Sequence, residues 1–160
     1  MTVGYMQSIA ERYQRLGYAP YRWFKAEDPP AWQPLPKPLA AARIGMLSTS
    51  GAYALGQVAY HYKDDASFRR IPAATEDRDL RFSHLTENYL VDARRDPGCI
   101  FPLRALGRLA AEGFVGGLAD EVLSCMGAVY SQRRVREELA PALLAEFKSQ
   151  KVDAALLVAM

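Results

Sequence analysis

The sequence has few of the residues that build metal centres, disulfide frameworks or membrane spans. The two cysteines, Cys99 and Cys125, form no CxxC pair, and the two histidines, His61 and His84, belong to no HExxH motif or Cys/His cluster. No apolar run approaches the length that crosses a bilayer. The N-terminus lacks the basic and apolar regions of a signal peptide. We therefore expect a cytoplasmic protein with no metal ion and no membrane partner.

An excess of charge of one sign is also missing. The chain has 20 Lys and Arg against 18 Asp and Glu, a net charge of +2, so we expect no nucleic-acid partner. The nucleotide fingerprints GxGxxG and GxxxxGK[ST] are absent. With 160 residues, of which 50% are apolar, the chain is long enough for one domain with a substantial core.

The most informative stretch that is present lies at residues 42–51. Residues 44–47 are apolar and are followed at once by Ser48, Thr49, Ser50 and Gly51. A short apolar run that stops in small polar residues predicts a buried strand ending in a loop. Open α/β sheets bind ligands at the carboxyl ends of parallel strands. We therefore expect a ligand crevice at this tip.

The rest of the chain predicts further strands and helices beside the first strand. Apolar runs at residues 121–126 and 152–160 predict two more buried strands, and residues 101–113 and 132–150 predict helices. Pro141 is expected to kink or break the second helix. Alternating strands and helices predict a parallel sheet. The predicted fold class is α/β, a single three-layer domain with a mostly parallel, Rossmann-like sheet.

The N-terminal part differs in composition. Residues 8–16 predict a short helix, and a Pro-rich segment follows, which is extended because proline fixes φ and biases its predecessor away from helix. The segment is either a ligand for a partner or a strap over the domain, with Trp23 and Trp32 as anchors. We expect residues 1–40 to form the helix and strap and residues 41–160 the α/β domain.

Several side chains could carry chemistry, each with a structural alternative. His84 ends a predicted strand, where it could be an acid, a base or a ligand, or a structural residue bonded to the backbone. Arg69 could clamp a carboxylate or lie in solvent on an edge strand. The turn around Ser50 could hold an anion on its backbone N–H groups. Cys99 lies near a predicted helix N-terminus, where a thiol can become a nucleophile, but beside apolar residues we expect it to be packed, like Cys125.

Nine motifs in a fixed order resemble those of one family, selenoprotein B of the glycine, sarcosine and betaine reductases and the related D-proline reductase subunit. The similarity covers roughly residues 30 to 160. The motifs are Pro30-Ala-Trp32, Pro36-Lys-Pro-Leu39, residues 42–51, Ser67-Phe-Arg-Arg-Ile-Pro72, Ser83-His84, Asp96 with Phe101-Pro-Leu-Arg-Ala-Leu, Glu112-Gly-Phe-Val-Gly116, Met126-Gly127 and residues 152–157.

The resemblance implies a subunit or truncated chain of a reductase. Such enzymes cleave a carbon–nitrogen bond α to a carboxylate, using a selenol or thiol and a dithiol donor. The family's redox residue, selenocysteine or cysteine, lies in a loop after the strand that matches residues 152–159, so we expect it beyond Met160, and we expect no other cofactor.

The resemblance also suggests roles for the candidate residues. By family position, His84 is the catalytic candidate, and Ser50 and Arg69 are the candidates for binding a small carboxylate or amino-acid-like substrate. Partner subunits or self-association are expected. The alternative is a non-catalytic α/β binding or scaffold protein that keeps the fold without the redox centre.

Overall fold

The computed structural model describes residues 4–19, 25–127 and 129–160. The chain divides into two units, Met1–Gln33 and Pro34–Met160. This division falls before residue 40, where we placed the boundary, and the predicted domain boundary stays a prediction. In the first unit, α1 (Tyr5–Arg15) begins before the predicted helix and has Gly4 as its N-cap residue. Trp32 is 87% exposed, and Trp23 lies outside the described residues. The strap therefore also stays a prediction.

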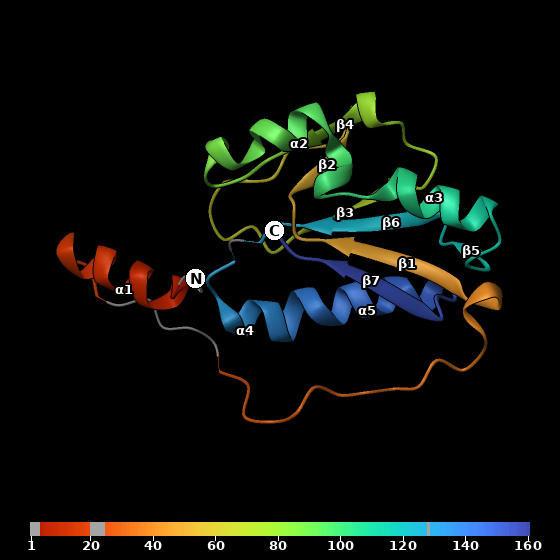
Figure 1. The fold of residues 1–160 in the computed structure, drawn as a ribbon, viewed down its shortest axis with the longest axis horizontal. Coiled ribbons are helices and arrows are strands. Elements are labelled where there is room, and N and C mark those ends of the chain that lie inside the picture. Colours follow the sequence, from red (N-terminus) through yellow and green to blue (C-terminus); the bar gives the residue numbers. More distant parts are fainter. Residues whose placement is uncertain (1–3, 20–24, 128) are drawn as a thin grey trace. The chain divides into compact units, whose positions relative to one another are not determined.

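The second unit is built on a sheet centred on β1 (Figure 1). β7 pairs with β1 in parallel over Ile44 to Ser48, and β5 and β6 pair in parallel with the start and the end of β1. Because β7 occupies one edge of β1 along this length, β5 and β6 share the other edge. The parallel strands are β1 (Arg43–Ser48), β5 (Gly117–Leu118), β6 (Glu121–Cys125) and β7 (Ala154–Val158).

Three further strands pair in the antiparallel sense. β3 (Phe68–Pro72) forms the far edge of the main sheet, antiparallel to β6. β2 (Ala52–Ala54) and β4 (Leu80–Phe82) form a separate two-stranded antiparallel sheet. The predicted mixed α/β fold with a mostly parallel sheet is confirmed, with β3 as the exception in the main sheet. The Rossmann-like classification stays a prediction.

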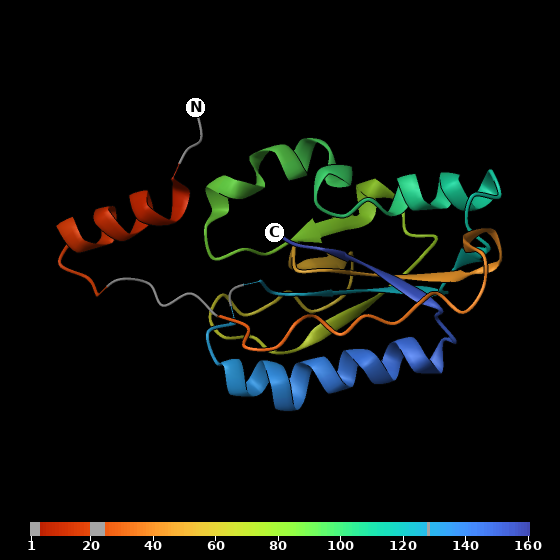
Figure 2. The same cartoon turned by 60° about the horizontal axis from the view of Figure 1, so that its bottom comes forward.

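Helices lie on both faces of the sheet (Figure 2). On one face, Leu106 of α3 belongs to a buried core with Met46 of β1. On the other face, Leu143 of α5 packs in a cluster with Leu123 of β6. The helices of this unit are α2 (Val91–Arg95), α3 (Leu103–Ala111), α4 (Gln132–Arg134) and α5 (Ala140–Ser149), with 3₁₀ turns at Leu39–Ala41, Asp77–Asp79, Glu87–Leu90 and Pro97–Cys99.

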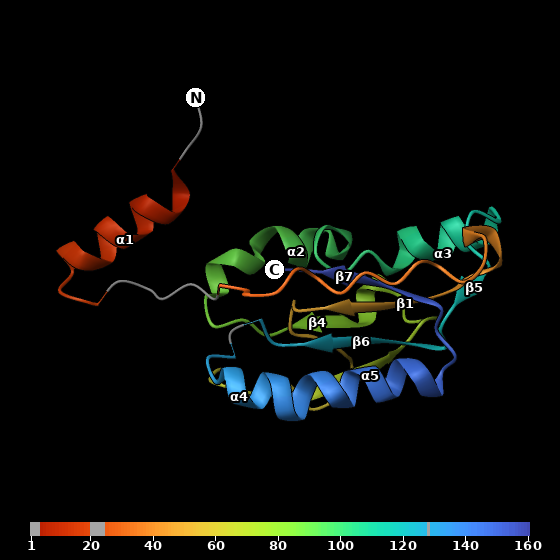
Figure 3. The same cartoon turned by 90° about the horizontal axis from the view of Figure 1, so that it is seen from below.

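The last helical segment does not break at Pro141. A π-helical stretch, Val135–Leu139, joins α4 to α5, so the helical path is continuous (Figure 3). Pro141 is the second residue of α5, which follows directly on the π stretch, the kind of local widening that accompanies an interruption of the helical hydrogen bonds. The wider π turn therefore replaces the expected break. Within the described residues, no helix is both long enough and apolar enough to span a membrane.

Candidate functional site

The tip of β1 is a buried cluster of hydroxyl groups. Ser48 and Ser50 are fully buried. The Ser48 hydroxyl donates to the carbonyl oxygen of Ile100 at 2.8 Å and accepts a hydrogen bond from the backbone N–H of Ser50 at 3.2 Å. These bonds tie the end of the central strand to the segment that leads into α3. The predicted polar tip at the carboxyl end of β1 therefore exists as a packed element.

The end of β7 meets this tip. The backbone N–H of Met160 donates to Thr49 Oγ1 at 2.9 Å, and the N–H of Thr49 donates to the carbonyl oxygen of Val158 at 3.0 Å. Gly127, after β6, lies against both segments, because a Cβ added there would come within 2.9 Å of the Met160 oxygen and 3.2 Å of the Thr49 oxygen. Three parallel strands thus end at one place.

Two hydroxyl groups at this end of the sheet are buried without a hydrogen-bond partner among the described residues. They are the Oγ atoms of Ser50 and Ser124, and Ser124 pairs with Ser48 across β6 and β1. A buried polar atom without a partner costs about 1 to 3 kcal/mol. The unused hydrogen-bonding capacity therefore marks the carboxyl end of the sheet as a polar site.

His84 directly follows a residue that is hydrogen-bonded to the tip of β1. The backbone N–H of Ser83 donates to the carbonyl oxygen of Gly51 at 3.0 Å. Gly51 has a φ of +64°, and a Cβ there would lie 2.0 Å from the Ser83 oxygen, so only glycine fits. His84 Nδ1 accepts the N–H of Thr86 at 2.9 Å. The same nitrogen also lies 3.1 Å from the carbonyl oxygen of Thr86, so the tautomer decides which of the two bonds it makes.

Arg69 makes a different set of contacts. Its guanidinium donates four hydrogen bonds, to the carbonyl oxygens of Val58, Ala59 and Phe68 and to the Ser67 hydroxyl. It also lies over the ring of Tyr60, 4.2 Å from the centroid. These bonds fasten the segment before β3 and occupy most of the donors that would bind a carboxylate. The structure does not show Arg69 in contact with Ser50 or His84.

The two cysteines have opposite surroundings. Cys125 is 3% exposed in β6, as predicted, and burial raises the pKa of its thiol to about 11, so it stays protonated near neutral pH. Cys99 is exposed, and the prediction that it is packed was wrong. It ends a 3₁₀ turn at the surface. The chain enters the core only after this turn, because Ile100 is half-buried and Phe101 is buried.

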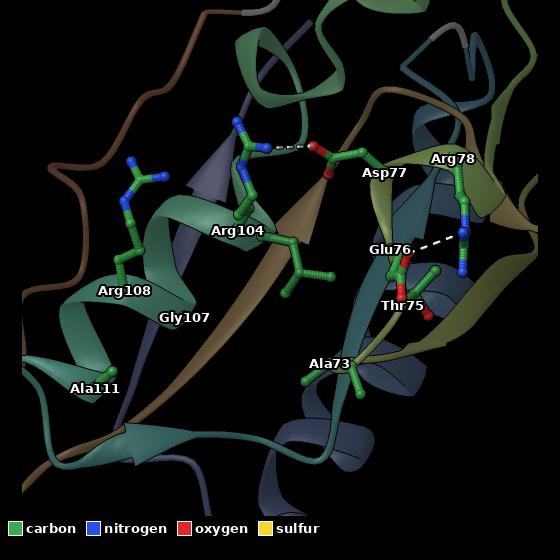
Figure 4. A pocket seen from close by; sticks show the side chains of 11 residues that line it. Ala73, Thr75, Glu76, Asp77, Arg78, Arg104, Gly107, Arg108 and Ala111 are labelled. Carbon is green, nitrogen blue, oxygen red and sulfur yellow. Dashed lines mark ion pairs between the residues drawn. The ribbon is translucent and has the colours of Figure 1, made fainter.

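Sequence reasoning missed a pocket of about 550 Å³ beside α3 (Figure 4). It is lined by Arg104, Gly107 and Arg108 of α3 and by the turn around Asp77, which pairs with Arg104 at 3.6 Å. Ala73, which also lines the pocket, donates its backbone N–H to the carbonyl oxygen of Asp120, the residue before β6. The pocket therefore lies toward the start of β6, away from the Ser48 tip. Two arginines four residues apart around a glycine on a predicted helix were the signal that could have found it.

Among the residues that the structure describes, no group of three or more His, Cys, Asp or Glu side chains is placed to hold a metal ion. The fold and the site together define the class: a mixed α/β domain with a mostly parallel sheet, in which the polar tip of the central strand meets the end of the last strand.

Comparison with known proteins supports the family relationship. The chain is 31% identical over 131 residues to D-proline reductase subunit gamma of Acetoanaerobium sticklandii, which covers 82% of this chain and 54% of that relative. The predicted relationship to the proline and glycine reductase family is thereby confirmed. The chain spans about half the length of this relative. No family model matches the sequence, and no solved structure matches it.

Proposed function

We propose that this chain supplies the substrate crevice of a reductase subunit that cleaves a carbon–nitrogen bond α to a carboxylate. D-Proline is the first substrate to test, because the relative is named a subunit of D-proline reductase. The proposal includes partner subunits, since that relative is one subunit of its enzyme, and a location in the cytoplasm. The alternative of a non-catalytic scaffold is not favoured by this relative.

One observation carries the proposal: the end of β7 converges with the tip of β1. In the family that the sequence resembles, the redox cysteine or selenocysteine follows the strand equivalent to β7. A loop that continues from Met160 would therefore start beside Thr49 and Gly127. Its contacts there are a hydroxyl group and a glycine, neither of which repels an anionic thiolate or selenolate. This position is also where open parallel sheets bind their ligands.

The reaction class sets what the crevice must do. Reductive cleavage breaks one C–N bond and forms one C–H and one N–H bond, which takes two electrons and two protons. A thiol or selenol with a dithiol donor supplies the electrons, and the dithiol becomes a disulfide. The chain's own residues must hold the carboxylate and deliver a proton to the departing nitrogen.

In this proposal His84 in its protonated form delivers the proton through Nε2, while its Nδ1–H donates to the carbonyl oxygen of Thr86, 3.1 Å away. The hydroxyl of Ser50 is fully buried and has no partner among the described residues, so the proposal requires the tip to move before this hydroxyl binds a substrate oxygen. Arg69 holds the adjoining segment and acts on the carboxylate through charge, because its donors are engaged locally.

The test compares this chain with a version extended in frame through the following loop. We expect the extended version, supplied with a dithiol and the partner subunits, to reduce D-proline, and the 160-residue chain to be inactive under the same conditions. His84→Gln in the extended version is expected to lower kcat by about 100-fold or more. Leu55→Ala, at a side chain that is 65% exposed, is the matched control and should leave the rate unchanged.

Two results would overturn the proposal. The first is an extended chain that binds D-proline without reducing it, which supports the scaffold alternative. The second is an intact mass of the protein from its native cells that ends at Met160, together with no turnover when partner subunits are added. An intact mass that includes a further cysteine or selenocysteine supports the proposal.

A further inference from the structure

The pocket beside α3 takes no part in the function proposed above. Its volume of about 550 Å³ is typical of sites that bind small molecules. One wall is the face of α3 that carries Arg104, Gly107 and Arg108, and the other is the segment at residues 73–78, which leads toward β4 (Figure 4). The pocket is therefore a second place on the domain where a ligand could bind.

The charges around this pocket do not cancel. It is lined by the arginines Arg78, Arg104 and Arg108 and by the carboxylates Glu76 and Asp77. Arg78 Nε lies 3.0 Å from a Glu76 oxygen, but Arg104 Nη1 lies 3.6 Å from an Asp77 oxygen, which is too long for a hydrogen bond. Within the described part of the chain, the Arg108 side chain has no hydrogen bond or ion pair. One positive charge is thus left uncompensated, on the face of α3.

Arg104 and Arg108 are placed to act together. They are four residues apart in α3, and Figure 4 shows their side chains on the same side of the helix. Two guanidinium groups one turn apart can donate to the oxygens of one carboxylate or phosphate group. The Arg104 side chain is 74% exposed, and an exposed ion pair contributes little to stability. An incoming anion can therefore draw Arg104 away from Asp77 at little cost.

Gly107, between these two arginines, is an independent sign of a ligand site. It stands in the middle of α3, where glycine destabilises a helix relative to alanine. Its φ is not positive, and an added Cβ would meet no atom of the described residues within 4 Å. Neither the backbone conformation nor close packing requires glycine here. A side chain at this position would instead take up space in the pocket, which Gly107 lines.

The remaining lining is apolar. Ala73 and Ala111 line the pocket from its two walls, and Leu103, which belongs to the buried core, also borders it. A ligand that matches these surroundings has one anionic group for the arginines and a small apolar body for the alanines and the glycine.

We propose that this pocket binds a small organic anion, a carboxylate or a phosphate monoester. Arg108 and Arg104 hold its charged group, and its apolar part lies over Gly107. The proposal does not rest on the reductase function, because binding here needs no redox residue. Failure to bind an anion would leave the proposed activity untouched, and an inactive protein would leave the binding untouched.

The test is a titration followed by NMR of the backbone amides, with benzoate and phenyl phosphate as probes. These two share an apolar ring and differ in the anionic group, and benzyl alcohol is the neutral control. We expect saturable shifts at residues 73–78 and 103–111 with at least one of the two anions, and none with benzyl alcohol. The anion that binds more tightly identifies the preferred charged group. Acetate and inorganic phosphate should bind more weakly, because they lack the ring.

Three variants locate the site. Arg108→Gln removes the uncompensated charge and should weaken binding by about tenfold or more. Arg95→Gln removes the same charge from a side chain that is 79% exposed outside the pocket, and it should leave binding unchanged. Gly107→Leu fills the pocket and should abolish binding. Its urea midpoint should not fall, because leucine favours a helix more than glycine does.

The titrations are carried out on the 160-residue chain and on the version extended in frame past Met160. Four results would overturn the proposal. One is the absence of saturable shifts with both anions, and another is equal weakening by Arg108→Gln and Arg95→Gln, which would mean attraction by net charge. The third is unchanged binding in Gly107→Leu, which would place the anion elsewhere. The last is binding to the shorter chain alone, which would mean that the protein's own continuation covers the pocket.

Discussion

β1 and β7 are neighbouring parallel strands in one sheet, yet they differ completely in exposure. Met46, in the middle of β1, is fully buried, whereas Leu157, near the end of β7, is 69% exposed. Both strands are short and apolar, and Met46 is paired in register with Leu156. The difference lies in their neighbours, since β1 has a strand on each edge and a helix on each face. Burial is thus a property of position in the sheet, and composition alone does not set it.

The largest effect should come from replacing a large apolar side chain with alanine in the buried strand, compared with the same kind of replacement in the exposed strand. Met46→Ala removes a side chain from a close-packed core, and we expect a loss of about 2 to 5 kcal/mol in the free energy of unfolding. Leu157→Ala should change it by no more than about 0.5 kcal/mol. Urea denaturation measures both. Equal losses in the two variants would contradict the comparison.

The same contrast shows what the sequence could predict about the fold. The strands at residues 121–126 and 152–160 and the helix at residues 101–113 were predicted from apolar patterning, which depends on local sequence. The prediction that the last strand is buried was wrong along its whole length, because residues 152–160 are half-buried or exposed and β7 lies at an edge. The antiparallel direction of β3 was also missed, since nothing within Phe68–Pro72 records which way its partner runs.

The candidate site was predictable to a similar extent. Ser48, Thr49 and Ser50 were located from the stop of an apolar run in small polar residues. The contact between Thr49 and Met160 joins residues 111 positions apart, and only the sheet register brings them together. The exposed state of Cys99 and the engagement of Arg69 by nearby carbonyl groups depend on turn geometry, for which the composition gave no signal. The roles of His84, Ser50 and Arg69 stay predictions.

A second substitution sharpens the comparison from the buried side. Gly45 of β1 lies under the ring of Phe147, and a Cβ there would come within 2.7 Å of that ring and 3.1 Å of Val152. We expect Gly45→Ala to cost about 1 to 3 kcal/mol by overpacking. Adding Phe147→Leu makes room, so the double variant should lose less than the two single losses added together. Additive losses, measured by urea denaturation, would show that the contact is not the cause.

A third substitution acts where the two strands end together. Thr49→Val keeps the side-chain shape but removes the hydroxyl that accepts the N–H of Met160 at 2.9 Å. We expect a loss of about 1 kcal/mol and faster hydrogen exchange of the amides at the end of β7, with little change in β6. Thr49→Ser keeps the hydroxyl and is the matched control. Unchanged exchange in Thr49→Val would mean that the end of β7 is held by other contacts.

The smallest effect concerns the charge that fastens the start of β7 to β1. Asp153 accepts the backbone N–H of Arg43 at 2.8 Å and pairs with Lys37 at 2.9 Å, and these two contacts hold the pKa of the Asp153 carboxyl below its usual value. A carboxyl whose pKa is lower in the folded state stabilises the fold at pH values above its unfolded pKa of about 3.9. That contribution is lost as the pH falls through the lower, folded value.

Asp153→Asn should therefore unfold at a lower urea concentration than the wild type at pH 7, and the difference between the two midpoints should shrink as the pH falls below about 4. Asn keeps a side-chain oxygen for the Arg43 N–H, so the change isolates the charge. Asp92→Asn, at a side chain that is 88% exposed, is the control and should show a smaller pH-dependent difference. A difference for Asp153→Asn that is constant with pH would mean that shape, and not charge, holds the exposed strand to the buried one.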